Sequence, residues 1–224
     1  MPKGKLIVME GACDGIGKTT QFKLLKSRLE QEGKKITTHH FPSYNTYQGK
    51  PVEMYLKGEY GFPQELSPYF INSLYAMDRA ITWEVELKKE YEKGEIILLD
   101  RYTTSSIIYQ SSVYDNLEER KKFIDYICDF EYEKLGIPKP DQVLFLTAPY
   151  EDIRKLREKR KENEGIVNDI HERDQSFMKA IYENAIVVSN YLGWDKIDCS
   201  QDGEIDSIEN IHEKVYEKVQ KKSF

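Results

Sequence analysis

A glycine-rich segment near the start of the sequence is typical of a phosphate-binding loop. It reads Gly11-Ala-Cys-Asp-Gly-Ile-Gly17-Lys18-Thr19-Thr20 and lies between an apolar stretch and a helical pattern. Glycines let backbone N–H groups turn inward around an anion, and the N-terminus of the next helix adds about half a positive charge. A lysine at this place reaches the terminal phosphates of a nucleotide, and the threonine hydroxyl after it binds Mg²⁺. The segment therefore predicts a nucleotide site.

The spacing of this loop departs from the usual pattern. Five residues separate Gly11 from Gly17, whereas four are usual between the first glycine and the Gly-Lys pair. Either Ala12 replaces the first glycine, or the loop holds one extra residue. Cys13 has two interpretations as well. In the first, the nearby helix terminus lowers the pKa of the Cys13 thiol and makes the thiol reactive. In the second, which we favour, Cys13 is a small side chain that only fills space.

A carboxylate ends a second apolar stretch, 96–99, at Asp100. Opposite a phosphate-binding loop, such a group holds Mg²⁺ through a water molecule. The alternative is that Asp100 only caps the following turn.

Arginines lie in or beside these segments, and guanidinium groups match phosphate oxygens well. They are Arg79, Arg101, Arg154, Arg157 and Arg160. No Ser-His-Asp or Cys-His pairing is suggested, and His39 and His40 are adjacent on a strand, so we interpret them as structural. Phosphoryl transfer needs mainly alignment and charge neutralisation, and an acceptor that is already a phosphate needs no strong base. The inventory thus favours transfer between phosphates.

Composition narrows the class of protein. The chain has 224 residues, with 33 Lys and Arg against 39 Asp and Glu, a net charge of −6, and 39% hydrophobic residues. These values exclude a disordered tail and a basic nucleic-acid coat. No apolar run approaches the roughly 20 residues that span a bilayer, and no signal peptide is apparent. We expect a cytoplasmic protein with reduced thiols and no nucleic-acid or membrane partner.

The elements that must position these residues alternate between strands and helices. We predict short strands at 6–9, 35–41, 96–99, 143–146 and 196–199, and helices over 22–33, 117–135 and 170–192. Such alternation predicts an α/β fold with a parallel sheet and helices on both faces. We place residues 1–224 in one domain. The very polar segment 151–164 is either a solvated helix face or a mobile basic lid.

Several of these segments together resemble the thymidylate kinase family. Residues 100–110 are similar to its DRYxxSSxAYQ signature, and residues 10–21 to its EGxDGxGKTTQ loop. Further similarities are Phe41-Pro42, residues 74–79 against LLFAADR, and residues 169–172 with Phe177 downstream. The resemblance implies a P-loop kinase fold with a five-stranded parallel sheet, a helical lid around 151–169 and a homodimer. It implies transfer of the γ-phosphate of ATP to dTMP with Mg²⁺, in dTTP synthesis.

The resemblance also assigns residues. It implies that Lys18, Arg101, Arg157 and Arg160 are catalytic, and that Thr19 and Asp100 hold the metal. ATP is expected to bind Gly11, Ala12, Cys13, Asp14, Gly15, Ile16, Gly17, Lys18, Thr19 and Thr20. dTMP is expected to bind Asp14, Phe41, Pro42, Tyr75, Arg79, Arg101, Tyr102 and Gln110.

Each acceptor residue has an implied role. Asp14 contacts the sugar hydroxyl and Arg101 the acceptor phosphate. Tyr75 stacks on thymine, while Arg79 and Gln110 bond the base edge. Tyr102 crowds the sugar C2′ and disfavours ribonucleotides. The sequence departs from the family at Tyr44, where an arginine is common two residues after the proline. Lys50 is a nearby cation that is a candidate replacement.

Two other functions remain open. A deoxynucleoside kinase shares the loop but wants a carboxylate base after the second strand, and residues 41–45, Phe-Pro-Ser-Tyr-Asn, offer none. A module that binds ATP without turnover is the second alternative. An assay with dTMP, thymidine or neither separates the three.

Overall fold

A five-stranded parallel sheet forms the centre of the molecule. The computed structural model describes residues 3–164, 175–201 and 203–223. The strands are β1 (Lys5–Gly11), β2 (Ile36–His40), β3 (Ile96–Asp100), β4 (Gln142–Thr147) and β5 (Asp195–Asp198), in the order β2-β3-β1-β4-β5. The five predicted strands are therefore confirmed. A small antiparallel pair, β6 (Ser200–Gln201) and β7 (Glu204–Ile205), was not predicted.

Burial explains which strands were easiest to recognise. Strands of a parallel sheet that are covered on both faces are almost continuously apolar, and Leu6 to Met9 of β1 are fully buried. The edge strand β2 is Ile-Thr-Thr-His-His and is only partly buried, so its pattern is weaker.

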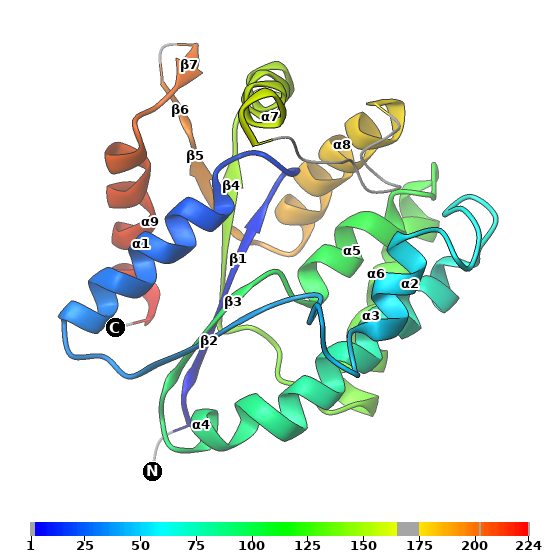
Figure 1. Cartoon of the computed structure of the whole chain (residues 1–224), viewed down its shortest axis with the longest axis horizontal. Coiled ribbons are helices and arrows are strands. Elements are labelled where there is room, and N and C mark those ends of the chain that lie inside the picture. Colours follow the sequence, from blue (N-terminus) through cyan, green and yellow to red (C-terminus); the bar gives the residue numbers. More distant parts are fainter. Residues whose placement is uncertain (1–2, 165–174, 202, 224) are drawn as a thin grey trace.

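Helices cover both faces of this sheet (Figure 1). On one side lie α1 (Lys18–Gln31) and α9 (Ile208–Ser223), which pack against each other. On the other side lie α3 (Pro68–Thr82), α5 (Thr103–Ser111), α6 (Leu117–Cys128) and α8 (Gln175–Tyr191). The shorter α2 (Lys50–Leu56) packs on α3, and α4 (Lys88–Glu92) follows a π-helical turn, η1 (Trp83–Leu87).

Polar contacts fasten α9 to α1. The Gln21 side chain donates to the carbonyl of Ile208 at 2.9 Å. Arg28 pairs with Glu213 at 2.6 Å and lies 3.4 Å from the centre of the Tyr216 ring. The helix that follows the phosphate-binding loop is thus held by a segment far along the chain.

The predicted helix over 117–135 is two helices of different type. α6 ends at Cys128, and the chain continues as the π-helical turn η2 (Asp129–Lys134). Within η2, Glu131 is fully buried and pairs with Arg79 of α3. The prediction missed this change because apolar periodicity does not report a buried ion pair.

The polar segment 151–164 is helical, as α7 (Tyr150–Glu164). Arg154 pairs with Glu151 and Glu158 along its surface, whereas Ile153 and Arg157 are buried. Residues 165–169 of the expected lid, and the motif at 169–172, lie outside the described residues.

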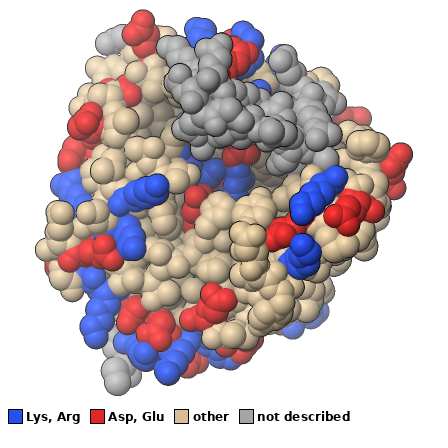
Figure 2. All heavy atoms as spheres, in the orientation of Figure 1, with Lys and Arg blue, Asp and Glu red and all other residues tan. Residues whose placement is uncertain are grey.

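The charged side chains follow the composition. On the face seen in Figure 2, basic and acidic side chains are interspersed among the described residues. Among the helices of that part of the chain, none has the length and apolarity needed to cross a membrane.

Candidate active site

Three strand ends bring the predicted chemistry to one edge of the sheet. Met9 of β1 and His40 of β2 are both in register with Asp100 of β3. The phosphate-binding loop follows β1 at the same edge. Ligands of open parallel sheets bind in the crevice beyond these carboxyl ends, so the fold itself places the loop beside Asp100.

The phosphate-binding loop has the usual length, because Gly11 belongs to strand β1 and not to the loop. Gly11 is still in register with Leu146 of β4, and the N–H of Ala12 donates to the carbonyl of Leu146 at 2.9 Å. Ala12 therefore stands at the first-glycine position, the first of the two alternatives. Gly15 and Gly17 have φ of 94° and 92°, a backbone conformation that favours glycine.

The surroundings of Cys13 favour a small filler over a reactive thiol. Its side chain is part of the apolar core. Burial, with the Asp14 carboxylate adding to it, raises the pKa of Cys13 to about 12. The nearby cations Arg157, Lys18 and Arg101 act in the opposite direction but do not prevail.

Arg157 of α7 lies directly on the phosphate-binding loop. A Cβ built on Gly15 would lie 3.0 Å from the Cβ of Arg157. Arg157 is 6% exposed, and its Nε and Nη1 have no hydrogen-bond partner among the described residues. Buried donors are nearly always paired, so this guanidinium fits an anion on the loop. The side chain of Arg160, the other expected lid arginine, lies outside the described side chains.

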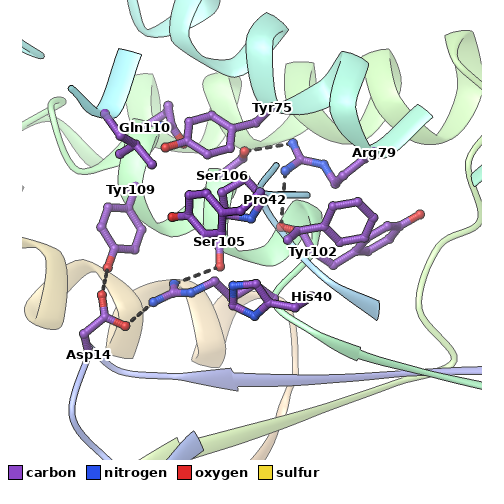
Figure 3. Close-up of a pocket in the computed structure, with 14 residues that line it drawn as sticks. Asp14, His40, Pro42, Tyr75, Arg79, Tyr102, Ser105, Ser106, Tyr109 and Gln110 are labelled. Atoms are coloured by element: carbon purple, nitrogen blue, oxygen red, sulfur yellow. Dashed lines mark hydrogen bonds and ion pairs between the residues drawn. The ribbon is translucent and has the colours of Figure 1, made fainter. Parts of the chain in front are cut away.

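A cavity of about 210 Å³ opens beside the loop. All eight residues expected to bind the acceptor line it. The sequence did not single out six more lining residues as ligands: His40, Tyr44, Leu56, Ser105, Ser106 and Tyr109. In Figure 3, the ten labelled lining residues come from at or near the end of β2, from α3 and α5, and from the phosphate-binding loop, and they surround the cavity.

Asp14 is the hub between the loop and the cavity (Figure 3). It accepts from Arg101, from the Tyr109 hydroxyl at 3.1 Å and from Lys18 Nζ at 3.4 Å. Burial alone would raise the pKa of Asp14, but Arg101 and Lys18 outweigh it and hold that pKa well below its usual range. Asp14 is therefore held in its ionised form, which makes it a poor proton acceptor.

Arg79 has partners inside the protein that the sequence did not indicate. Its side chain is 1% exposed and is clamped by Glu131, with Nε at 2.7 Å and Nη2 at 2.6 Å from the two carboxylate oxygens. Nη2 also donates to Ser106 Oγ at 2.8 Å. Most of the guanidinium is thus satisfied inside the protein, and Nη1, which makes only a 3.5 Å contact with the Tyr102 carbonyl, is the part left for a ligand.

Tyr102 does not point its hydroxyl at the cavity. The hydroxyl donates to the carbonyl of Pro138 at 3.1 Å, and the ring packs on Phe41 with centroids 5.9 Å apart. Tyr109 has the hydroxyl that reaches into the cavity, because it donates to Asp14. Burial raises the pKa of Tyr109 well above its usual value, so this phenol stays a donor.

Asp100 has the environment of a metal ligand. Its Oδ2 lies 3.1 Å from His40 Nδ1, while Oδ1 is buried with no hydrogen-bond partner among the described residues. Burial would raise the pKa of Asp100, but the contact with His40 and the charge of Lys18 lower it overall. Thr19 lies next to Lys18 with an exposed side chain. A carboxylate and a hydroxyl are oxygen donors of the kind Mg²⁺ prefers, so these residues fit the ion.

The place of the missing arginine is taken by an aromatic side chain. Tyr44 is 47% exposed, lines the cavity and stacks on His40, with ring centroids 6.1 Å apart. Lys50 instead pairs with Glu53 at 3.4 Å and is not among the residues lining the cavity.

Two buried carboxylates that hold residues of this site were not predicted. Glu10 is 1% exposed and accepts from Thr104 at 2.8 Å and Ser105 at 2.5 Å, both on α5. Glu131 has the same function toward Arg79 and Thr103. A glutamate at the end of an apolar strand was a usable signal for Glu10, whereas nothing near Glu131 in the sequence distinguishes it from its exposed neighbours.

Comparisons with known proteins agree with this geometry. The family model described as thymidylate kinase matches residues 9–217. A thymidylate kinase of a Thermoanaerobacter species is 35% identical over 158 residues, which is 70% of this chain and 72% of that protein. One from Danio rerio is 25% identical over 217 residues, covering 95% and 88% of the two chains. The fold is similar to a Candida albicans thymidylate kinase structure, with a TM-score of 0.73, 24% identity and coverage of 99% and 93%.

Proposed function

The chain belongs to the thymidylate kinase family, and we propose how its residues perform the phosphorylation of dTMP by ATP. The sheet edge offers two adjoining half-sites: a phosphate-binding loop on β1, and a cavity that all eight expected acceptor residues line. The observation that carries the proposal is the Asp14–Arg101 ion pair, which joins the two halves. A donor phosphate on the loop and an acceptor phosphate at Arg101 then meet.

The donor half holds the phosphates of ATP. The loop N–H groups and Lys18 bind them, and Arg157 adds its unpaired donors from above. Charge-assisted bonds of this kind are about twice as strong as neutral ones. Because the cations stand in place before transfer, they stabilise the developing charge without rearranging during the step. We include Arg160 as a second lid cation.

Mg²⁺ is the proposed cofactor. Thr19 and Asp100 would hold it, and the bound ion would neutralise charge on the transferring phosphate. Asp100 stays ionised because His40 and Lys18 lower its pKa against the effect of burial.

The acceptor half binds dTMP through its phosphate, its base and its sugar. Arg101 takes the phosphate, and Tyr75 stacks on the base. Gln110 and the free edge of Arg79 contact the base edge; Gln110 Oε1 is buried with no partner among the described residues. Asp14 and Tyr109 face the sugar. Tyr102 keeps its expected place beside C2′, because it lines the cavity although its hydroxyl donates to the carbonyl of Pro138.

A neutral hydroxyl acceptor fits this cavity poorly. It would need a carboxylate base, and the carboxylate that lines the cavity, Asp14, is ion-paired and has a lowered pKa. A coupled assay with ATP·Mg²⁺ and dTMP, thymidine or no acceptor tests the proposal. Turnover with dTMP alone supports it, and turnover with thymidine or with neither acceptor contradicts it.

We also propose a homodimer through α3 and η1. Phe70, Met77 and Val85 are 43%, 47% and 66% exposed and recur at helical spacing along this continuous segment. A contiguous exposed apolar patch marks an interaction site, and two copies of one chain pair most often through an isologous interface. Light scattering should give twice the chain mass, and Met77→Glu should halve it; a wild-type monomer contradicts the proposal.

A further inference from the structure

A buried glutamate outside the loop and the cavity governs the base-recognising arginine. Glu131 lies on η2, is fully buried and does not line the cavity. We infer that Glu131 is a positioning residue. It fixes which N–H groups of Arg79 face the acceptor base, and so makes the cavity select a pyrimidine with a carbonyl at C4 over one with an amino group.

Counting the guanidinium donors shows how the selection arises. Arginine offers five N–H bonds in a rigid planar fork. Glu131 takes the one on Nε and one on Nη2, and Ser106 takes the other on Nη2. The edge that remains is Nη1, with one contact of 3.5 Å to the Tyr102 carbonyl. Arg79 therefore shows the cavity only donors, which suit a carbonyl oxygen.

Glu131 is itself held from two directions. Thr103 donates to its Oε2 at 2.8 Å, and the N–H of Ile137 donates to its main-chain carbonyl at 3.2 Å. Thr103 begins α5, the helix that presents Ser106, Tyr109 and Gln110 to the cavity. The carboxylate thus fixes Arg79 of α3 relative to the helix that forms the other wall.

Gln110 provides the acceptor that complements the Arg79 donors. Gln110 Oε1 is buried and finds no partner among the described residues, so it suits a ligand N–H. A base with C4=O and N3–H satisfies both Arg79 and Gln110. A base with C4–NH₂ and an unprotonated N3 sets a donor against Arg79 and offers no N3–H to Gln110 Oε1, which is the type of mismatch that polar sites reject most strongly.

Kinetics with two acceptors test the inference, which rests on the proposed function. Glu131→Gln keeps the shape of the side chain but turns an N–H₂ toward donors of Arg79. We expect KM for dTMP to rise about tenfold and the kcat/KM ratio of dTMP to dCMP to fall about tenfold. KM for ATP should change less than about twofold. The matched control is Glu133→Gln, an exposed residue of the same turn, which should leave all three values unchanged.

A second variant and a binding measurement keep the test decisive. Thr103→Val removes the donor to Glu131 and should shift the dTMP:dCMP ratio in the same direction by about threefold. It decides the question if Glu131→Gln does not fold. Calorimetric binding of dTMP and dCMP to each folded variant gives the same ratio without turnover. A lower melting temperature with an unchanged dTMP:dCMP ratio would show a merely structural role and overturn the inference. Wild-type protein inactive with dTMP would instead overturn the proposed function.

Discussion

Arg157 of α7 packs on Gly15 of the phosphate-binding loop so closely that a Cβ on Gly15 would lie 3.0 Å from the Arg157 Cβ. The backbone of α7 is also close, with the Arg157 Cα 3.4 Å from the same Gly15 Cβ position. The Arg157 side chain is 6% exposed, and its Nε and Nη1 have no partner among the described residues.

Replacing Arg157 should therefore separate activity from stability. Arg157→Ala removes a phosphate contact, and we expect kcat to fall at least about 100-fold, as when one oxyanion donor is lost. Because a buried unpaired polar group costs free energy, the melting temperature without nucleotide should stay the same or rise. Arg154→Ala, on the same helix but paired at the surface, is the control. Equal losses of kcat in both variants would refute this role.

Lys18→Ala should abolish phosphoryl transfer and leave the fold intact. The loss of a charged donor on the transferring phosphate is expected to lower kcat at least about 100-fold. Lys23→Ala, on an exposed position of the same helix, is the matched control, and circular dichroism checks folding. A near-normal kcat for Lys18→Ala would exclude the kinase mechanism.

Arg79 has two functions that a pair of variants can separate. Arg79→Ala leaves Glu131 buried without its cation, which costs about 3–5 kcal/mol in the free energy of unfolding. Arg79→Met combined with Glu131→Leu removes both charges, so its stability should lie closer to wild type. Both variants should raise KM for dTMP and leave KM for ATP nearly unchanged. If the double variant recovers KM for dTMP together with stability, Arg79 does not contact the base.

Tyr44→Arg should strengthen the acceptor site. A well-placed charged contact to the phosphate contributes about 1.5–3 kcal/mol, and much less where solvent screens it, so KM for dTMP should fall. Lys50→Ala should have no effect, because Lys50 pairs with Glu53 outside the cavity. Saturation curves with dTMP measure both. A change below about twofold for Tyr44→Arg, roughly 0.4 kcal/mol, would count against this placement.

The Cys13 thiol should respond to pH in a defined window. Its pKa is raised from 9.0 to about 12 in the folded protein, so the folded state holds the proton more tightly than the unfolded state. The stability this gives is complete below pH 9 and is lost as the pH rises toward 12. Chemical unfolding at several pH values should show a shallower alkaline loss for Cys13→Ala. Alkylation of Cys13 at pH 8 should be slow with or without ATP, and ATP protection from rapid labelling would contradict the assignment.

The features that could be predicted from the sequence are those that depend on residues close together in the chain. Apolar runs and the Gly-Lys-Thr segment gave the strands, the loop and, through resemblance, eight residues that do line one cavity. Glu131 was out of reach because its partner lies 52 positions away. Tyr102 does line the cavity, but motif membership did not indicate that its hydroxyl donates to Pro138. The contact of His40 with Asp100 depends on strand register, which the sequence alone left open.

The packing of α9 on α1 also affects the order in which the chain can fold during synthesis. The core side of α1 includes Leu25 and Leu29, while α9 supplies Val215 and Val219 to the same apolar cluster nearly two hundred residues later. At about 5–20 residues per second, a ribosome needs roughly 10–40 s to make the intervening chain. During that time the apolar side of α1 lacks its final cover. A nascent chain stalled before residue 208 should therefore recruit chaperones and bind ATP weakly, even though its phosphate-binding loop has already left the exit tunnel.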